Sequence, residues 1–292
     1  MVGVFLCFPQ LFRFRDQSLI ILMSSSYYVA SEQRGRGLSL FMKYLRLGSR
    51  FPLVATTANE QSVALLDRFD ARPIPGTDHE LIGVVRWRPM VEEWIQRRIG
   101  WKRPARLAAA AGGPLAALWG SSLKPRTDAE LRVIESARDL EAIGIPQPEQ
   151  QKDCLTADRG IAFLRWRYFG GADATRRLFV VRFESGQECM VAAKLRRRGY
   201  REQIRALSVM DLWGRLPQDG VHRVLSLLAA HYQGRIDLVS LRGQPEQVER
   251  RLLQQGFLRR DFPNAVGWFM DPAGLLPTKK WYLTPADGDA AV

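Results

Sequence analysis

A β-prone segment, a turn with two glycines and an amphipathic segment follow one another between residues 19 and 47. This order restricts the fold more than any other feature of the chain. The apolar residues 19–23 and 27–29 predict a strand. Leu38, Phe41 and Leu45 keep the spacing of one helix face, which predicts a helix over about 37–47. The turn between them reads Arg34-Gly35-Arg36-Gly37-Leu38-Ser39.

A strand, a glycine turn and a helix in this order can hold a phosphate group. Glycine lets the backbone approach an anion closely, and the first turn of a helix points unpaired N–H groups at it. Arg34 and Arg36 add two fork-shaped cations. The alternative is an ordinary strand-to-helix loop whose arginines face solvent. Both interpretations stay open at the level of these residues.

The same order of elements occurs in both halves of the chain. The first half predicts strands at 19–29, 51–56 and 81–87 and helices at 37–47 and 60–69. The second half predicts strands at 179–183, 190–195, 203–210, 236–241 and 265–270 and helices at 221–232 and 245–255. The repetition favours two related α/β domains over one. We expect them at 1–88 and 127–292, joined by a basic linker rich in Ala, Gly and Pro at 89–126.

The charge of the chain favours an anionic partner. The 292 residues carry a net charge of +13, and the sequence pI is about 10.2. A phosphorylated cofactor, a nucleic acid or an acidic membrane surface would each fit this charge. No nucleic-acid motif is recognised, so nucleic-acid binding ranks last. The charge-free run 107–123 lies within the basic stretch 97–126; we interpret it as a linker that packs on the protein, with weak peripheral membrane contact as the alternative.

Cysteines and histidines predict neither a disulfide framework nor a metal site. Cys7, Cys154 and Cys189 are far apart and form no Cys-x-x-Cys pair, which indicates three reduced thiols in a cytoplasmic protein. The three histidines have no metal-ligand spacing, so no metal is expected. Near the C-terminus, Asp287-Gly288-Asp289 lacks the further ligands of a calcium loop, and we expect a mobile tail there.

The first half resembles the GNAT superfamily of acyl-CoA-dependent N-acetyltransferases. The family signature is Arg or Gln, two residues, Gly, one residue, then Gly or Ala; residues 34–39 match it, with Ser39 as the last small residue. Asn59 stands at the start of the next predicted helix, as an Asn does in the family. More loosely, residues 162–168 and 281–287 make the chain similar to bacterial proteins with two tandem GNAT-like domains. The resemblance implies an α/β (α+β) fold in which each domain is a mixed, mostly antiparallel twisted sheet flanked by helices.

The resemblance also implies a site and a reaction. The pyrophosphate of acetyl-CoA, the acyl donor, would lie on the backbone N–H groups of 34–39, and its pantetheine would pair with the strand at 27–30. The amine of a small-molecule or protein acceptor would attack the thioester directly, without a metal. The implied cofactor-binding residues are Val29, Arg34, Gly35, Arg36, Gly37, Leu38, Ser39 and Asn59.

Three departures from the family pattern put activity in question, and the catalytic residues stay unassigned. Leu66 occupies the position where many members carry a general-acid Tyr. The nearest glutamate, Glu32, lies in the loop and not on the strand. Only a little over 30 residues precede the turn, where the family has an earlier strand and two helices; a shortened sequence, a misassigned start codon or completion by the second half would each explain this.

The second half is predicted to be degenerate, because residues 211–220 carry a proline and two acids where pyrophosphate would bind. A non-catalytic GNAT-like module that binds a ligand or partner is therefore the alternative to an N-acyltransferase, and a basic nucleic-acid-binding protein is the third. The sequence leaves the oligomeric state open.

Overall fold

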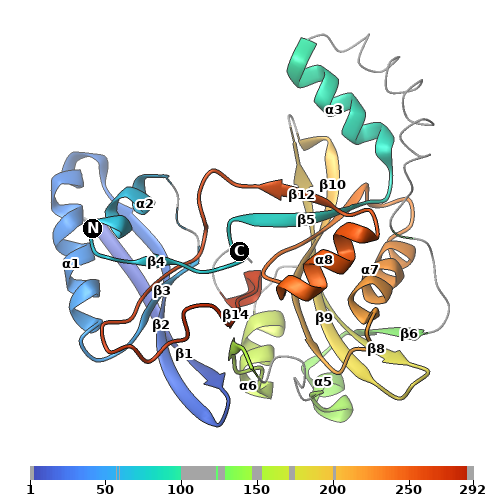
Figure 1. Ribbon diagram of the computed structural model, residues 1–292, viewed down its shortest axis with the longest axis horizontal. Coiled ribbons are helices and arrows are strands. Elements are labelled where there is room, and N and C mark those ends of the chain that lie inside the picture. The colour runs from blue at the N-terminus through green and yellow to red at the C-terminus, as the bar shows by residue number, and fades with distance from the viewer. Residues whose placement is uncertain are drawn as a thin grey trace.

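The structure, a computed structural model, describes residues 3–56, 58, 60–99, 123, 129–146, 153–170, 175–199 and 202–287. The described chain forms two seven-stranded sheets, each with helices against it (Figure 1). Both sheets are mixed and mostly antiparallel. The predicted fold class, α/β with two mixed twisted sheets flanked by helices, is therefore confirmed.

The first sheet combines the N-terminal strands with three strands from later in the chain. In spatial order it consists of β14 (Trp281–Tyr282), β7 (Leu155–Ala157), β1 (Gly3–Phe14), β2 (Gln17–Val29), β3 (Leu53–Ala55), β13 (Trp268–Met270) and β4 (Arg72–Pro73). The helical segments of this unit are η1 (Ser31–Arg36), α1 (Gly37–Leu47) and α2 (Glu60–Asp67). The predicted helix at 37–47 is confirmed with the same bounds.

The second sheet consists of β12 (Leu258–Asp261), β5 (His79–Val84), β11 (Leu238–Leu241), β10 (Ile204–Gly214), β9 (Glu188–Arg198), β8 (Arg176–Phe183) and β6 (Ala129–Ile134). Its helical segments are α3 (Trp87–Ile99), α5 (Ala137–Ile143), α6 (Ile161–Leu164), η3 (Arg165–Phe169), α7 (Gly220–His231), α8 (Glu246–Gln254) and η5 (Pro285–Asp287). Helix α3 occupies the first part of the segment that the sequence predicts as a linker. Its residues are rich in Arg and Trp and show little helical periodicity, so the pattern does not predict a helix there.

The two units exchange one strand with each other. Strand β5 follows β4 in the chain but lies between β11 and β12 of the second sheet. Strand β13 follows β12 but lies between β3 and β4 of the first sheet. The expectation that strands at 81–87 and 265–270 close their own units was therefore wrong. The apolar pattern of a strand is the same in either sheet, so the sequence could not predict which sheet each of these strands joins.

Sheet membership consequently does not follow the division of the chain at 88 and 127. The segment 79–84 lies before that division but belongs to the second sheet, whereas β7, β13 and β14 lie after it but belong to the first. The division into two domains stays a prediction. These four strands also mean that neither sheet is completed by its own half of the chain alone.

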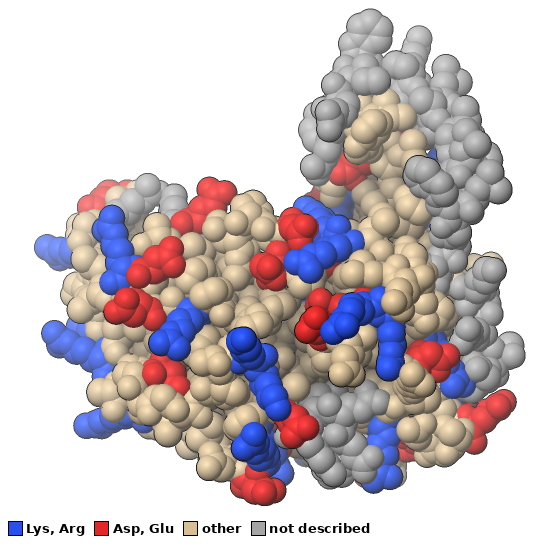
Figure 2. Space-filling model, in the orientation of Figure 1, with Lys and Arg blue, Asp and Glu red and all other residues tan. Residues whose placement is uncertain are grey.

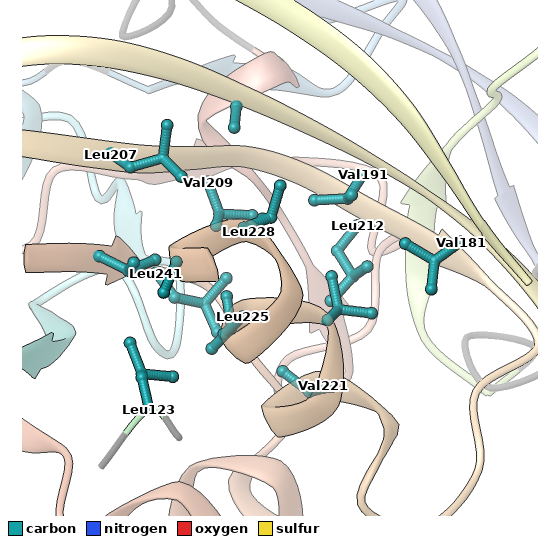
Figure 3. Packing of buried hydrophobic residues seen from close by; sticks show 14 of the residues in the cluster. Leu123, Val181, Val191, Leu207, Val209, Leu212, Val221, Leu225, Leu228 and Leu241 are labelled. Atoms are coloured by element: carbon teal, nitrogen blue, oxygen red, sulfur yellow. The ribbon is translucent and has the colours of Figure 1, made fainter. Parts of the chain in front are cut away.

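The larger hydrophobic core lies between α7, α8 and one face of the second sheet. Figure 3 shows Leu225 and Leu228 of α7 pointing toward Leu207 and Val209 of β10. Burying a side chain of this size contributes roughly 1.5–3 kcal/mol. Leu123 joins the same core at 5% exposure. The rest of the predicted linker and membrane-contact stretch, residues 100–122 and 124–126, lies outside the described residues.

The first sheet is covered on both faces. Helices α1 and α2 pack Phe41, Tyr44 and Leu66 against one face. The other face carries Phe12, Ile21 and Met23, which pack with residues of the later chain: Leu155, Leu276, Trp281 and Leu283.

Charged side chains of both signs are interleaved on the face shown in Figure 2. Basic side chains project along the edge of the molecule that α1 forms, where Arg36, Lys43, Arg46 and Arg50 are exposed. Among the described residues of this face, basic side chains form no continuous surface of the kind that a nucleic-acid duplex would cover. Within the described part of the chain, no helix is long and apolar enough to cross a membrane.

Candidate active site

The first candidate site lies where the parallel strands β2 and β3 separate. They pair only over residues 22–24 and 53–55. Strand β3 then ends at Ala55, whereas β2 continues to Val29. The register between β1 and β2 also shifts here, between Phe5 and Cys7, so that β2 carries a bulge. A strand edge that has lost its neighbour presents backbone groups with which an extended, amide-containing ligand can pair.

The glycine turn directly follows this free edge, and it is exposed. Gly35, Arg36, Leu38 and Ser39 are all exposed, Leu38 at 51%. Helix α1 begins at Gly37, and its N-cap residue Arg36 makes no side-chain capping bond. The N–H groups of the first turn, at Leu38 and Ser39, therefore have no capping side chain and point toward a place that favours an anion.

The turn is more helical than the sequence indicates. Residues 31–36 form a short 3-10 helix with a kink at Gln33, whose N–H bonds Ala30 O at 2.9 Å. A 3-10 helix directs N–H groups to carbonyls three residues earlier, so fewer donors are open than in an extended loop. The donors that fit an anion best are accordingly those of the first turn of α1.

A side chain at Gly37 would displace Tyr27, whereas the backbone conformation of Gly37 does not call for glycine. A Cβ at this position would lie 2.5 Å from the Tyr27 hydroxyl oxygen and 3.3 Å from Val29 Cγ2. Tyr27 itself packs on Phe5, with ring centroids 5.4 Å apart, and burial raises the pKa of its hydroxyl. Gly35 differs, because no atom lies within 4 Å of the place where its Cβ would be.

The structure brings most of the predicted cofactor-binding residues together. Val29 ends β2, and residues 34–39 follow it within one turn and the start of α1. Of Arg34 the structure describes only the backbone, and Asn59 lies outside the described residues. Their assignment to acyl-CoA stays a prediction.

No described residue near this turn is an evident general acid or base. Leu66 is 5% exposed in the core between α2 and the sheet, so it supplies packing there. Glu32 is exposed, and a hydrogen bond from Ser31 lowers the pKa of its carboxyl. Tyr28 is 62% exposed and Tyr27 is 45% exposed, and alternation along the strand directs the two rings to opposite faces. The Tyr27 hydroxyl lies beside the start of α1, 2.5 Å from the place where a Gly37 Cβ would be.

The second sheet repeats the geometry of the first. Strands β10 and β11 are parallel over 206–208 and 238–240, and β10 then continues to Gly214 while β11 ends at Leu241. The register of β10 on β9 shifts between Val209 and Asp211. Helix α7 begins after the loop 215–219. Asp211, which the sequence analysis placed in this loop, belongs to the strand instead.

The C-terminal segment 281–287 contacts both strands where they separate. The Tyr282 hydroxyl donates a hydrogen bond to Leu212 O on β10. On the β11 side, a Cβ at Gly243 would lie 1.9 Å from Leu283 O. Thr284 Oγ1 lies 3.2 Å from Asp211 Oδ1. The chain itself therefore occupies the place that corresponds to the free edge of β2, which favours the first unit as the ligand site.

A buried ion cluster fixes this segment. Arg159 Nε donates to Asp211 Oδ2 at 2.6 Å, and its Nη1 lies 2.7 Å from Asp287 Oδ1. All three side chains are at most 3% exposed. The expectation of a mobile tail was wrong for Asp287, which is fully buried. The sequence offers no local signal for this cluster, because Arg159 and Asp211 are 52 residues apart and Asp211 and Asp287 are 76 residues apart.

Asp211 makes stability depend on pH. Burial raises its pKa to about 6, although Arg159 opposes the shift. Because an unfolded Asp titrates near pH 4, the folded state binds more protons between about pH 4 and 6. The stability that this group contributes is full below about pH 4 and falls by about 3 kcal/mol as the pH rises through 6. Asp211→Asn should flatten this part of a urea-unfolding series, and an unchanged slope would contradict the assignment.

Two further features of the described residues bear on chemistry. A cavity of about 290 Å³ lies between the start of α7 and helix α8, where Asp219 and Arg251 contribute opposite charges. No group of three or more His, Cys, Asp or Glu side chains in the described part of the chain is placed to hold a metal ion.

Solved structures of acyltransferases share this fold. A probable N-acyltransferase from Enterococcus faecalis superposes with a TM-score of 0.55 at 10% identity, covering 92% of this chain and 58% of that one. N-myristoyltransferase from Saccharomyces cerevisiae, with bound myristoyl-CoA and inhibitors, gives 0.52 at 11% identity over 98% of this chain and 68% of that one. A GCN5-related N-acetyltransferase from Kribbella flavida gives 0.50 at 11% identity over 95% and 60%.

The chain therefore has the fold of the GNAT superfamily, as the resemblance of its glycine turn implies. At these identities the likeness is one of fold. The chain spans about three fifths of the length of the Enterococcus and Kribbella proteins. Comparison with protein-family models and with curated proteins yields no match.

Proposed function

We propose that this protein is an acyl-CoA-dependent N-acyltransferase that binds its acyl donor in the first unit. The observation that carries the proposal is the free edge of β2 leading into an exposed, uncapped start of α1, within a GNAT-type sheet. The diphosphate of the donor would accept hydrogen bonds from Leu38 and Ser39 N–H, with Arg36 beside it. Its pantetheine amides would pair with β2 near Val29, and Asn59 would contact the thioester end.

In the proposed reaction an acceptor amine attacks the thioester carbonyl carbon. A C–N bond forms, the C–S bond breaks, the amine loses a proton and CoA leaves as the thiol. Acetyl is the proposed acyl group, the acceptor is a small-molecule or protein amine, and the proposed setting is the bacterial cytoplasm. Structural neighbours include a myristoyl-CoA enzyme, so acetyl-CoA and myristoyl-CoA should both be tested as donors.

The second candidate is a non-catalytic module that binds acyl-CoA or a partner. It is favoured by Leu66, which is packed in the core, and by Glu32, which is exposed to solvent. Release of free thiol from acetyl-CoA in the presence of amine pools separates the two. Binding of acetyl-CoA without turnover would support the module, and turnover would support the enzyme.

Gly35→Glu is expected to weaken acetyl-CoA binding by about a hundredfold or more. The new side chain has open space, so the fold is spared, but its carboxylate would stand beside the diphosphate. Gly35→Gln is the matched control, since it adds nearly the same bulk without charge and should retain most of the affinity. Isothermal titration calorimetry measures both. Equal affinities for Glu and Gln variants, or no binding heat from the folded wild type, would overturn the site.

A further inference from the structure

Three arginines surround one buried carboxylate on the second sheet. Glu80 of β5 is fully buried. Its Oε2 lies 2.8 Å from Arg198 Nη2 and 3.5 Å from Arg242 Nη2, and its Oε1 lies 3.2 Å from Arg260 Nη1. The arginines come from β9, from the residue after β11 and from β12, so three separate strands aim them at one point.

The cluster carries more positive charge than Glu80 can neutralise. Burial by itself would raise the pKa of Glu80, but Arg198, Arg242 and Arg260 lower it below its usual range, so the carboxylate is ionised. Three guanidinium groups and one carboxylate leave two positive charges together. Burial lowers the pKa of Arg242, and the like charges of Arg198 and Arg260 lower it further. An added anion would relieve this repulsion.

Two acids near β12 pair with Arg259. Asp261 accepts a hydrogen bond from Arg259 Nε at 2.6 Å, and Asp78 lies 3.8 Å from the same guanidinium. On β5, Arg259 is paired with Leu81, and the Leu81 side chain lies in the core under α7 and α8. Arg260 is paired with Glu80. Asp261 and Asp78 therefore lie with Arg259, on the face of β12 opposite to Arg260.

The arginines are accessible and held in place. The exposed fractions of their side chains are 20% for Arg198, 26% for Arg242 and 55% for Arg260. The guanidinium carbon of Arg242 lies 4.5 Å from the Phe262 ring centroid, which restrains it. Guanidinium groups that are held in this way match the oxygens of a carboxylate or phosphate.

The position of the cluster connects it to the first unit. Arg242 also lines a small cavity between the sheets, together with Thr56, Gly267 and Thr284. Thr56 directly follows β3, one of the two strands whose separation forms the candidate acyl-CoA site. We propose that Arg198, Arg242 and Arg260 bind a carboxylate or phosphate group of the acceptor, an assignment that rests on the acyltransferase function proposed above.

The test compares two arginines that are adjacent in β12. Arg260→Gln removes one guanidinium from the cluster and leaves Glu80 paired with the other two. Arg259→Gln makes the same change of charge on the opposite face and is the matched control. Calorimetric titration with inorganic phosphate and with succinate, against sodium chloride of equal ionic strength, should show roughly tenfold weaker binding for Arg260→Gln and little change for Arg259→Gln.

Two further arms separate the proposal from the function on which it rests. Acetyl-CoA should bind Arg260→Gln as it binds the wild type, while kcat/KM falls roughly tenfold for acceptors with an anionic group and stays unchanged for those without one. Equal losses in the two variants, no binding of phosphate or succinate, or a loss confined to acetyl-CoA would overturn the acceptor site. Failure of the wild type to bind acetyl-CoA would instead overturn the proposed function, and phosphate binding would still report on the cluster.

Discussion

Replacing Arg159 with methionine is expected to lower the free energy of unfolding by about 3–5 kcal/mol, because Asp211 and Asp287 would remain buried without their cation. Methionine keeps much of the apolar volume, so the loss reports on charge and not on a cavity. The penalty should be smaller at pH 5 than at pH 8, since unpaired buried carboxylates take up protons. Urea unfolding at both pH values measures it.

The control for this variant is Arg13→Met. Arg13 makes an ion pair with Asp158 at 2.8 Å, but its side chain is 61% exposed. Solvent screens such a pair, and its loss should cost no more than about 1 kcal/mol. If both variants lost the same small amount of stability, the buried cluster would not be what fixes the C-terminal segment.

Local patterns predicted the elements of the first unit well. Helix α1 has the predicted bounds, but its buried face consists of Gly37, Phe41 and Tyr44. Of the predicted face, Phe41 is buried and Leu38 is 51% exposed. The strand predicted over 51–56 is β3, Leu53–Ala55, and the helix predicted over 60–69 is α2, Glu60–Asp67. Helices α1 and α2 pack against the sheet formed by their chain neighbours, so spacing along the chain carries the information.

What the sequence could not predict depends on contacts between distant segments. Strand β5 is buried on both faces, and nothing in its residues says that β11 and not β3 is its neighbour. Asp287 looked like part of a polar tail because its partner Arg159 is 128 residues away. Arg198 belongs to a basic run that suggests a solvated face, yet its guanidinium pairs with Glu80.

The candidate site shows the same limit. The spacing of residues 34–39 predicted a turn at the start of a helix, and the turn is there. The spacing could not show that Tyr27 packs on Gly37, or that the turn is a 3-10 helix. It also could not show that the corresponding place in the second unit is occupied by Tyr282 and Thr284. That contact, more than the acids of 211–220, distinguishes the two units.

Gly243→Ala is expected to lower the free energy of unfolding by about 2–5 kcal/mol. Gly243 has φ +67°, which costs an L-residue about 1–2 kcal/mol, and its Cβ would overlap Leu283 O at 1.9 Å. The obstacle is backbone, so relief requires the C-terminal segment to move away from β10 and β11. Overpacking of this kind adds about 1–3 kcal/mol. Urea unfolding measures the total, and limited proteolysis should release the C-terminal segment sooner than in the wild type.

Gly234→Ala is the control that separates backbone strain from the overlap with Leu283 O. Gly234 has φ +75°, but no atom lies within 4 Å of the place for its Cβ, so the variant carries the backbone strain without the overlap. Its loss should be about 1–2 kcal/mol, with no change in proteolysis. The difference between the two variants is then the cost of displacing residues 281–287 from the second sheet. Equal losses would show that this segment yields freely, and the argument that it closes the second unit to a ligand would fail.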